Sequence, residues 1–333
     1  MEGTTFFFSW EVPLMEYLQS GMGSALTLVM FVITMFGEEA VAVGILAFLY
    51  WVWDKEAAVF AGTNVLVGTV LNPFLKNFAL RRRPYFDHPT ITCFKPVHEG
   101  DIYDIAAQGF SFPSGHSSNS VILFGSLKLV SRYMPQIRPA RKEGEENAPA
   151  QGMGGFLYAI PRLWTAVAVL IPLLVGLSRM MLGVHYPTDV LFGWASGVVV
   201  MLAVSQAQIR IKKQEYLYLF LAIVFLPGFF FCKTNDYYTC YGIMTGFFAA
   251  RVLDLRLIRF EGTRNVRAAV LRLVFGLAFF YALNVLFKLP FSDEFLQSAT
   301  TGQFLFRAVR YFLISFVMLG VYPAAFKKVK WLR

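Results

Sequence analysis

The sequence predicts an all-α membrane protein whose helices cross the bilayer about nine times, and three observations support this prediction. Of the 333 residues, 56% are hydrophobic and 15% are charged, whereas a soluble domain normally has about 25% charged residues. Apolar runs recur from Val41 to Phe326, and most basic residues gather in the polar segments between them. The natural solvent of such a chain is lipid, so we expect a single integral membrane domain.

Nine segments are apolar and near the length of about 20 residues that a membrane helix needs. These segments are residues 39–54, 57–79, 114–131, 162–181, 186–207, 214–231, 238–254, 268–288 and 305–326. The stretch 25–36 is apolar but too short to cross alone, and Gly37-Glu38-Glu39 interrupts its continuation. We expect it to lie at the membrane interface or to be re-entrant.

The basic residues predict the orientation of these spans. When the faces are numbered alternately, 19 Lys and Arg residues fall on one face and 10 on the other. The richer face is expected to be cytoplasmic, which leaves the N-terminus outside and the C-terminus inside. Residues 135–155 then form a flexible cytoplasmic loop. The net charge of +9 therefore reflects topology, and we expect no nucleic-acid partner.

Three polar patches stand at the predicted outer ends of apolar helices. The first is Lys76, followed after six residues by Arg83-Pro84; the second is Pro113-Ser114-Gly115-His116; the third is Ser178-Arg179, five residues, His185, three residues and Asp189. Because the topology puts all three on one face, segments far apart in the chain can converge on one site.

The residue types in these patches suit a tetrahedral dianion. Lys76, Arg83 and Arg179 supply three cations, two of them guanidinium forks that match phosphate oxygens. Gly115 follows Pro113-Ser114 where a helix begins, and free N–H groups with the helix dipole make an anion site there. We therefore expect a phosphate site at the outer surface.

Two histidines complete the predicted site. His185 and Asp189 are four residues apart and share one face of a helix, so Asp189 can orient the imidazole for attack on phosphorus. His116 stands beside the phosphate site and suits protonation of the leaving oxygen. Phosphoryl transfer needs mainly positioning and charge neutralisation, so we expect neither a metal nor a cofactor.

The three patches resemble the motifs of the type 2 phosphatidic acid phosphatase superfamily, which includes bacterial acid phosphatases, glucose-6-phosphatase and vanadium haloperoxidases. All eleven residues of the family pattern are present at the family spacing, and the resemblance covers roughly residues 39–207. It implies that His185 is the nucleophile, Asp189 its partner, and His116 the general acid and later base. The phosphate-binding residues that it implies are Lys76, Arg83, Ser114, Gly115, Ser178 and Arg179.

With this resemblance, the chain divides into an interfacial segment (1–38), a catalytic membrane core (39–207) and further helices with a basic tail (208–333). We expect a metal-independent phosphatase for a lipid phosphomonoester or diphosphate: phosphatidate, lysophosphatidate, a sphingoid phosphate or polyprenyl diphosphate. A soluble sugar phosphate is the alternative substrate, and a transporter or channel is the alternative outside enzymes. The absence of an Asn-x-Ser/Thr site favours a bacterial plasma membrane over the ER membrane, with the site facing away from the cytoplasm.

Several other residues have structural interpretations. Cys232 and Cys240 are expected to be packing thiols, with a disulfide as the alternative. Arg81 and Arg82 have no motif role and are expected to contact headgroups or support the site. His88 and His98 show no metal-ligand spacing. Arg272 and Asn284 are expected to make contacts between helices.

Overall fold

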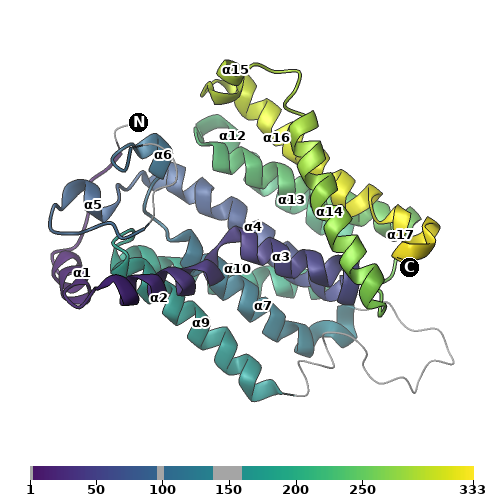
Figure 1. The fold of residues 1–333 in the computed structure, drawn as a ribbon, viewed down its shortest axis with the longest axis horizontal. Helices are drawn as coiled ribbons and strands as arrows, with labels where there is room; N and C mark the ends of the chain where they lie inside the picture. Colours follow the sequence, from purple (N-terminus) through teal and green to yellow (C-terminus); the bar gives the residue numbers. More distant parts are fainter. Residues whose placement is uncertain (1–2, 96–100, 138–159) are drawn as a thin grey trace.

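The computed structural model describes residues 3–95, 101–137 and 160–333, which form a bundle of roughly antiparallel helices (Figure 1). Apart from one isolated bridge between Thr4 and Arg81, the regular structure of the described residues is helical. The predicted all-α class is therefore confirmed. The N-terminus lies at the end of the bundle that holds α1, α5 and α6, and the C-terminus lies at the other end.

Each predicted span corresponds to a helix or to a run of adjoining helices. These are α3 (Glu39–Phe48) with η2 (Leu49–Trp53), α4 (Lys55–Ala79), α7 (Gly115–Ile137), α9 (Pro161–Met181), α10 (Pro187–Arg210), α11 (Gln214–Phe225) with α12 (Gly228–Phe231), α13 (Asn235–Leu253), α14 (Val266–Leu286), and α16 (Thr301–Phe316) with η4 (Val317–Val321) and α17 (Ala324–Lys328). Six helical segments of the described chain are long and apolar enough to cross a membrane on their own. Helices α7 and α13 fall outside this set because their first turns are polar, and α3 with η2 is short, so a count of nine spans stays a prediction.

The N-terminal segment is a bent helix pair. Helix α1 (Glu11–Gln19) and the run of α2 (Ser24–Thr34) and η1 (Met35–Gly37) meet at 119°, the geometry of a broken span or a re-entrant loop. Helix α2 packs on α9, and η1 packs on α7. The apolar stretch 25–36 is therefore held against the helices that carry the polar patches.

Helix α4 is the centre of the bundle. Of its most apolar 18 residues, 78% are buried inside the protein, compared with 17% for the peripheral α14. It packs against α7, α10 and α13. Asn64, near its middle, donates to the hydroxyls of Ser126 and Ser205, so hydrogen bonds as well as apolar packing join α4 to α7 and α10. The last turn of α4, with Lys76, is thereby fixed relative to its neighbours.

Glycines let α10 approach α7 closely. A Cβ at Gly193 would lie 2.7 Å from the carbonyl oxygen of Ser114, and one at Gly197 would lie 2.9 Å from that of Ser118. Spaced four residues apart, these glycines form the small-residue seam common between membrane helices. This seam fixes the first turns of α7 against α10.

The C-terminal helices are tied to the rest of the bundle by buried polar contacts. Arg251 of α13 bridges Glu56 at 2.5 Å and Asp254 at 3.0 Å. Arg272 of α14 donates to the carbonyl oxygens of Trp51, Glu261 and Leu332, and Arg310 donates to Asn284. The predicted inter-helix roles of Arg272 and Asn284 are thus confirmed.

Some local predictions need correction or fall outside the structure. Residues 135–137, expected in a loop, belong to α7, because polar residues end an apolar run without ending a helix. The remainder of that loop, 138–155, and His98 lie outside the described residues. Cys232 and Cys240 are buried free thiols, as expected for packing residues. His88 packs edge-on against Phe7, with ring centroids 4.5 Å apart.

Candidate active site

A polar cavity of about 140 Å³ lies where the three sequence patches meet. It is enclosed by the end of α4, the loop after it, the first turns of α7, the end of α9, His185 in the turn before α10, and parts of α3 and α13. Its lining residues are Gly37, Glu38, Glu39, Asn72, Pro73, Lys76, Arg83, Lys95, Gly115, His116, Asn119, Arg179, His185, Asp236 and Cys240. Six of the nine predicted site residues are among them: Lys76, Arg83, Gly115, His116, Arg179 and His185.

Arg83 is anchored by backbone carbonyl groups. Its Nε and Nη2 donate to Gln108 at 3.0 and 2.7 Å, and its Nη1 donates to Val184 at 3.1 Å. Pro84 begins the short helix α5 (Pro84–Asp87) and keeps Arg83 in extended backbone. Because these bonds use one hydrogen on each nitrogen, each terminal nitrogen retains a second hydrogen for a ligand in the cavity.

Arg179 is a buried cation whose donors are largely unused. Its side chain is 1% exposed, and Nη1 donates to Thr34 at 2.9 Å. Its Nε has no hydrogen-bond partner in the described part of the chain. A buried guanidinium in this state is costly unless an anion completes its coordination. Arg179 therefore indicates that the cavity binds an anion.

Two lysines add to the positive charge. Within the described residues, Lys76 makes no ion pair with a carboxylate. Burial, together with the nearby charges of Arg179 and Arg83, lowers the pKa of Lys95 to about 8. Four cations therefore crowd around one small space, which favours a multiply charged anion such as phosphate.

The start of α7 lies at the cavity, where Gly115 and His116 line it. Ser114 N donates to the carbonyl oxygen of Asp189, and the 23-residue helix follows from Gly115. A Cβ on Gly115 would lie 3.0 Å from Asn72 Oδ1. Glycine therefore keeps the entry to the helix N-terminus open, where N–H groups and the helix dipole attract anions.

His185 is a buried titratable group of the cavity. Its Nδ1 lies 3.5 Å from Asp189 Oδ2 and 3.5 Å from Ser111 Oγ. Both contacts are made by Nδ1, so Nε2 is the ring nitrogen that they leave unused. Burial and the surrounding charges of Arg83, Arg179, Lys76 and His116 hold the pKa of His185 well below its ordinary value. A neutral imidazole with a free nitrogen lone pair is a competent nucleophile.

Asp189 lies behind His185 in a fully buried network. Its Oδ2 accepts from Tyr186 N at 2.8 Å and from the Ser111 hydroxyl. Its Oδ1 accepts from Arg81 Nη1 at 2.6 Å, and Arg81 Nη2 donates to Glu11 Oε2 at 2.7 Å. Since each carboxylate has a charged partner, the network can hold Asp189 ionised and fixed in place.

His116 has a carboxylate partner of its own. Its Nε2 lies 3.0 Å from Glu38 Oε1, and its side chain is 18% exposed. Glu38 stands at the start of α3, just after Gly37. His116 and His185 line the same cavity, so a phosphoryl group bound there is within reach of both rings.

Ser114 and Ser178 are placed differently from the cavity-lining residues. The Ser114 hydroxyl accepts from Ser117 Oγ at 2.9 Å, and the Ser178 hydroxyl donates to the carbonyl oxygen of Val175 at 2.6 Å. Both side chains are fully buried and neither lines the cavity. In this structure they support the helix ends that carry His116 and Arg179.

Several residues around the site were predicted only in part or not at all. Arg81 was expected to contact headgroups or support the site, and the structure bears out the second role, since Arg81 bridges Asp189 and Glu11. Ser111, Glu11 and Lys95 lie outside the motifs, and no local pattern marks them. Glu38 did leave a signal, because a carboxylate inside an apolar stretch of a membrane protein is usually functional.

Two family models match parts of this chain. The family model described as the PAP2 superfamily matches residues 57–213, and one described as "PAP2 superfamily phosphatase, transmembrane extension" matches residues 238–332. Phosphatidylglycerophosphatase B of Bacillus subtilis (strain 168) is 30% identical over 144 residues, which are 43% of this chain and 54% of that protein. The chain thus matches about half the length of that relative.

A solved structure is also similar, the first transmembrane PAP2 type phosphatidylglycerolphosphate phosphatase from Bacillus subtilis. It is 24% identical with a TM-score of 0.44, and the alignment covers 60% of this chain and 85% of that one. The two family models together span the polar patches and the C-terminal helices, and they confirm the resemblance drawn from the motifs. The chain is an integral membrane protein with a PAP2 superfamily domain at residues 57–213 and the transmembrane extension of PAP2 superfamily phosphatases at residues 238–332.

Proposed function

We propose that this protein hydrolyses the phosphate ester of a membrane lipid through a phosphohistidine formed on His185. The observation that carries the proposal is the juxtaposition of His185, paired with Asp189, with Lys76, Arg83, Arg179 and His116 around one cavity. The cations bind and neutralise the phosphate. The histidines supply the nucleophile and the proton.

In the first step, His185 Nε2 attacks phosphorus and forms a P–N bond while the P–O bond to the lipid alcohol breaks. The leaving oxygen takes a proton from His116, which becomes neutral. The imidazole of His185 gains positive charge as the bond forms, and Asp189, 3.5 Å from Nδ1, stabilises that charge. Arg83 and Arg179 bind the equatorial oxygens, where charge collects in the transition state.

In the second step, water attacks the phosphohistidine opposite the P–N bond. His116 takes a proton from this water, the P–N bond breaks, and the electron pair returns to His185. Inorganic phosphate leaves, and His116 is again protonated. Because the side chains present supply every proton and charge in this sequence, we expect the reaction to need neither a metal nor a cofactor.

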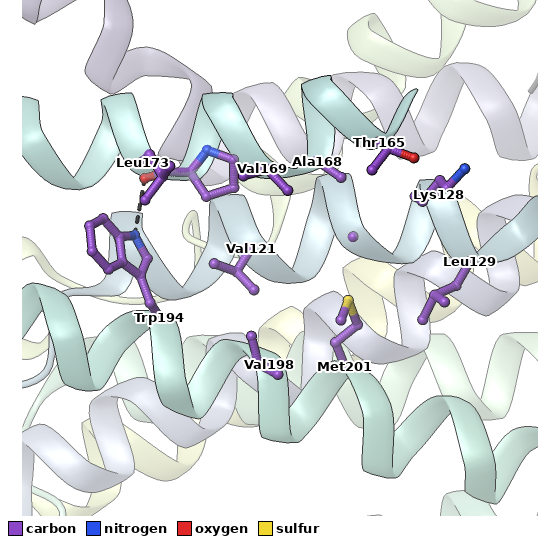
Figure 2. A pocket seen from close by; sticks show the side chains of 12 residues that line it. Val121, Lys128, Leu129, Thr165, Ala168, Val169, Leu173, Trp194, Val198 and Met201 are labelled. Carbon is purple, nitrogen blue, oxygen red and sulfur yellow. Dashed lines mark hydrogen bonds between the residues drawn. The ribbon is translucent and has the colours of Figure 1, made fainter. Parts of the chain in front are cut away.

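An apolar groove supports a lipid as the substrate. A cavity of about 400 Å³ runs between α7, α9 and α10, and its lining is almost entirely apolar, with Val121, Val169, Trp194, Val198 and Met201 among its residues (Figure 2). Helix α7 contributes Gly115 and His116 to the polar cavity and Val121 to the groove, about 9 Å further along its axis. A phosphate in the cavity and an acyl chain in the groove can therefore belong to one molecule.

The names of the similar proteins also support a lipid phosphate. Both matched Bacillus proteins are phosphatases of phosphatidylglycerophosphate by name. With the charge bias of the loops, this relationship supports a bacterial plasma membrane with the site on the extracytoplasmic side. Cysteine labelling tests which side of the membrane carries the site. Single cysteines are placed at residue 103 or at residue 212 in a variant free of other cysteines, and cells are treated with a membrane-impermeant thiol reagent. We expect labelling of intact cells only at residue 103.

The direct test of substrate class is phosphate release from purified protein. We expect turnover of lipid phosphates, including phosphatidylglycerophosphate and phosphatidate, in mixed micelles. The His185→Ala variant should be inactive. Turnover of soluble sugar phosphates alone would refute the lipid substrate and leave the reaction standing.

A further inference from the structure

Glu38 is a charged residue of the cavity that comes from outside the PAP2 superfamily match. It precedes α3, whereas the match begins at residue 57. Its side chain is 43% exposed, and Oε1 lies 3.0 Å from His116 Nε2. In the described part of the chain, Glu38 is the carboxylate that forms an ion pair with this histidine.

The backbone places this carboxylate closely. A Cβ on Gly37 would lie 2.7 Å from the carbonyl oxygen of His116 and 2.9 Å from Val175. Only glycine allows η1 to approach the first turn of α7 and the end of α9 this closely. The next residue, Glu38, therefore lies within reach of His116.

The electrostatic surroundings of His116 indicate a role for Glu38. His116 shares the cavity with Arg179 of α9, with Lys95 and Arg83 of the loops, with Lys76 of α4 and with His185; the other acids of the cavity are Glu39 of α3 and Asp236 of α13. These cations oppose a proton on His116, yet a general acid must carry one. The hydrogen bond with His116, aided by the charges of His116, Arg179 and Lys95, lowers the pKa of Glu38 to about 2. Glu38 therefore stays ionised at any working pH.

We propose that Glu38 is a positioning residue that favours the protonated form of His116 and directs its Nδ1–H toward the leaving oxygen. The inference rests on the proposed phosphatase function. Glu38 accepts the Nε2–H of His116 throughout, while the Nδ1 proton moves to the leaving oxygen and is later restored from water. The site then has two carboxylate–histidine pairs, Asp189 with His185 and Glu38 with His116, and the second pair depends on the N-terminal segment.

The Glu38→Gln variant tests this role because it keeps the shape and removes the charge. We expect kcat for a lipid phosphate to fall at least tenfold, since general acid catalysis contributes about 10²- to 10⁴-fold. Loss of the anion disfavours protonated His116, so the alkaline limb of the kcat–pH profile should move to lower pH by about one unit or more. Glu38→Asp should restore part of the activity and the original limb.

A substrate with a good leaving group separates this role from a structural one. p-Nitrophenolate leaves without help from an acid, so in a single turnover, before the water step, Glu38→Gln should release p-nitrophenolate from p-nitrophenyl phosphate at close to the wild-type rate. Equal losses on p-nitrophenyl phosphate and on the lipid phosphate, with an unmoved pH profile, would overturn the inference. Glu16→Gln, an exposed change on α1, is the matched control and should leave both activities unchanged.

A double variant shows whether Glu38 acts through His116. Adding Glu38→Gln to His116→Ala should cost no further activity on the lipid phosphate if His116 carries the effect. A further loss equal to that of the single Glu38→Gln variant would contradict the inference. Failure of the wild-type protein to release phosphate from either substrate would refute the proposed function as well, so the two failures are distinguishable.

Discussion

Arg81 offers the sharpest test of how the fold positions the nucleophile. Its guanidinium is 1% exposed and bridges two carboxylates that are each 0% exposed, Asp189 at 2.6 Å and Glu11 at 2.7 Å. The change Arg81→Ala leaves both carboxylates buried without their cation. It also removes one of the donors that fix Asp189 behind His185.

The expected cost follows from the burial of these charges. Removing one partner of a buried ion pair typically costs about 3 to 5 kcal/mol, because the remaining charge stays unpaired in a low dielectric. Arg81→Ala leaves two such charges unpaired, so we expect the free energy of unfolding to fall by an amount at or above the upper end of this range. Arg82→Ala is the matched control. The side chain of Arg82 is 30% exposed and pairs with Asp87 at 3.3 Å, so we expect this change to lower the free energy of unfolding by at most about 1 kcal/mol.

Two assays check this prediction. Thermal unfolding in detergent compares the stabilities, and phosphate release per folded molecule compares the activities. We expect Arg81→Ala to lower kcat at least 100-fold because Asp189 no longer holds His185 in one orientation. Adding Glu11→Gln should recover part of the stability and little of the activity. Equal effects of Arg81→Ala and Arg82→Ala on kcat would refute the role given to the buried network.

Three further predictions follow from the groove, the cations and the glycine seam. Val198→Trp should fill the groove and raise KM several-fold for a long-chain lipid phosphate but not for a short soluble ester. The control is Val199→Trp, which should leave KM unchanged because Val199 lies outside the groove. Equal KM changes for the two variants would contradict the groove as the binding site of the acyl chain. Phosphate release should be the same with and without a chelator such as EDTA, and a several-fold loss restored by a divalent cation would contradict the metal-free reaction. Gly193→Ala would put a Cβ 2.7 Å from the Ser114 carbonyl oxygen and displace the start of α7, so kcat should fall at least tenfold. The control Gly44→Ala, whose Cβ would have nothing within 4 Å, should leave kcat unchanged.

The sequence predicts the helices well because apolar runs and helix-compatible residues determine them. The ends are less certain: α7 extends six residues beyond the predicted end at 131, since Arg132 and Tyr133 can continue a helix outside the apolar layer. The alternating directions of the predicted helices also place Lys76, His116 and His185 at one end of the bundle.

The supporting residues could not be predicted in the same way. Arg81 and Glu11 pair across 70 positions, and Glu11 meets Thr188 across 177; neither distance leaves a periodic pattern in the sequence. The directions of the Ser114 and Ser178 hydroxyls depend on which neighbouring groups compete for their hydrogen bonds. Each bonds a neighbour three residues away, as serine often does near helix ends. The anomaly at Glu38 was visible in the sequence, whereas its partner was not.

The central claim is a covalent phosphohistidine at His185, and trapping that intermediate tests it most directly. Purified protein is mixed with a lipid phosphate labelled in its phosphate group, quenched in alkaline denaturant and digested for peptide analysis. We predict labelled phosphate on His185 that survives base and is released by acid, as a phosphoramidate should be. The label should accumulate further in His116→Ala with a p-nitrophenyl phosphate substrate, because the water-activating base is missing, and it should be absent in His185→Ala. Efficient turnover by the His185→Ala variant, or a phosphate label that it retains, would contradict the account.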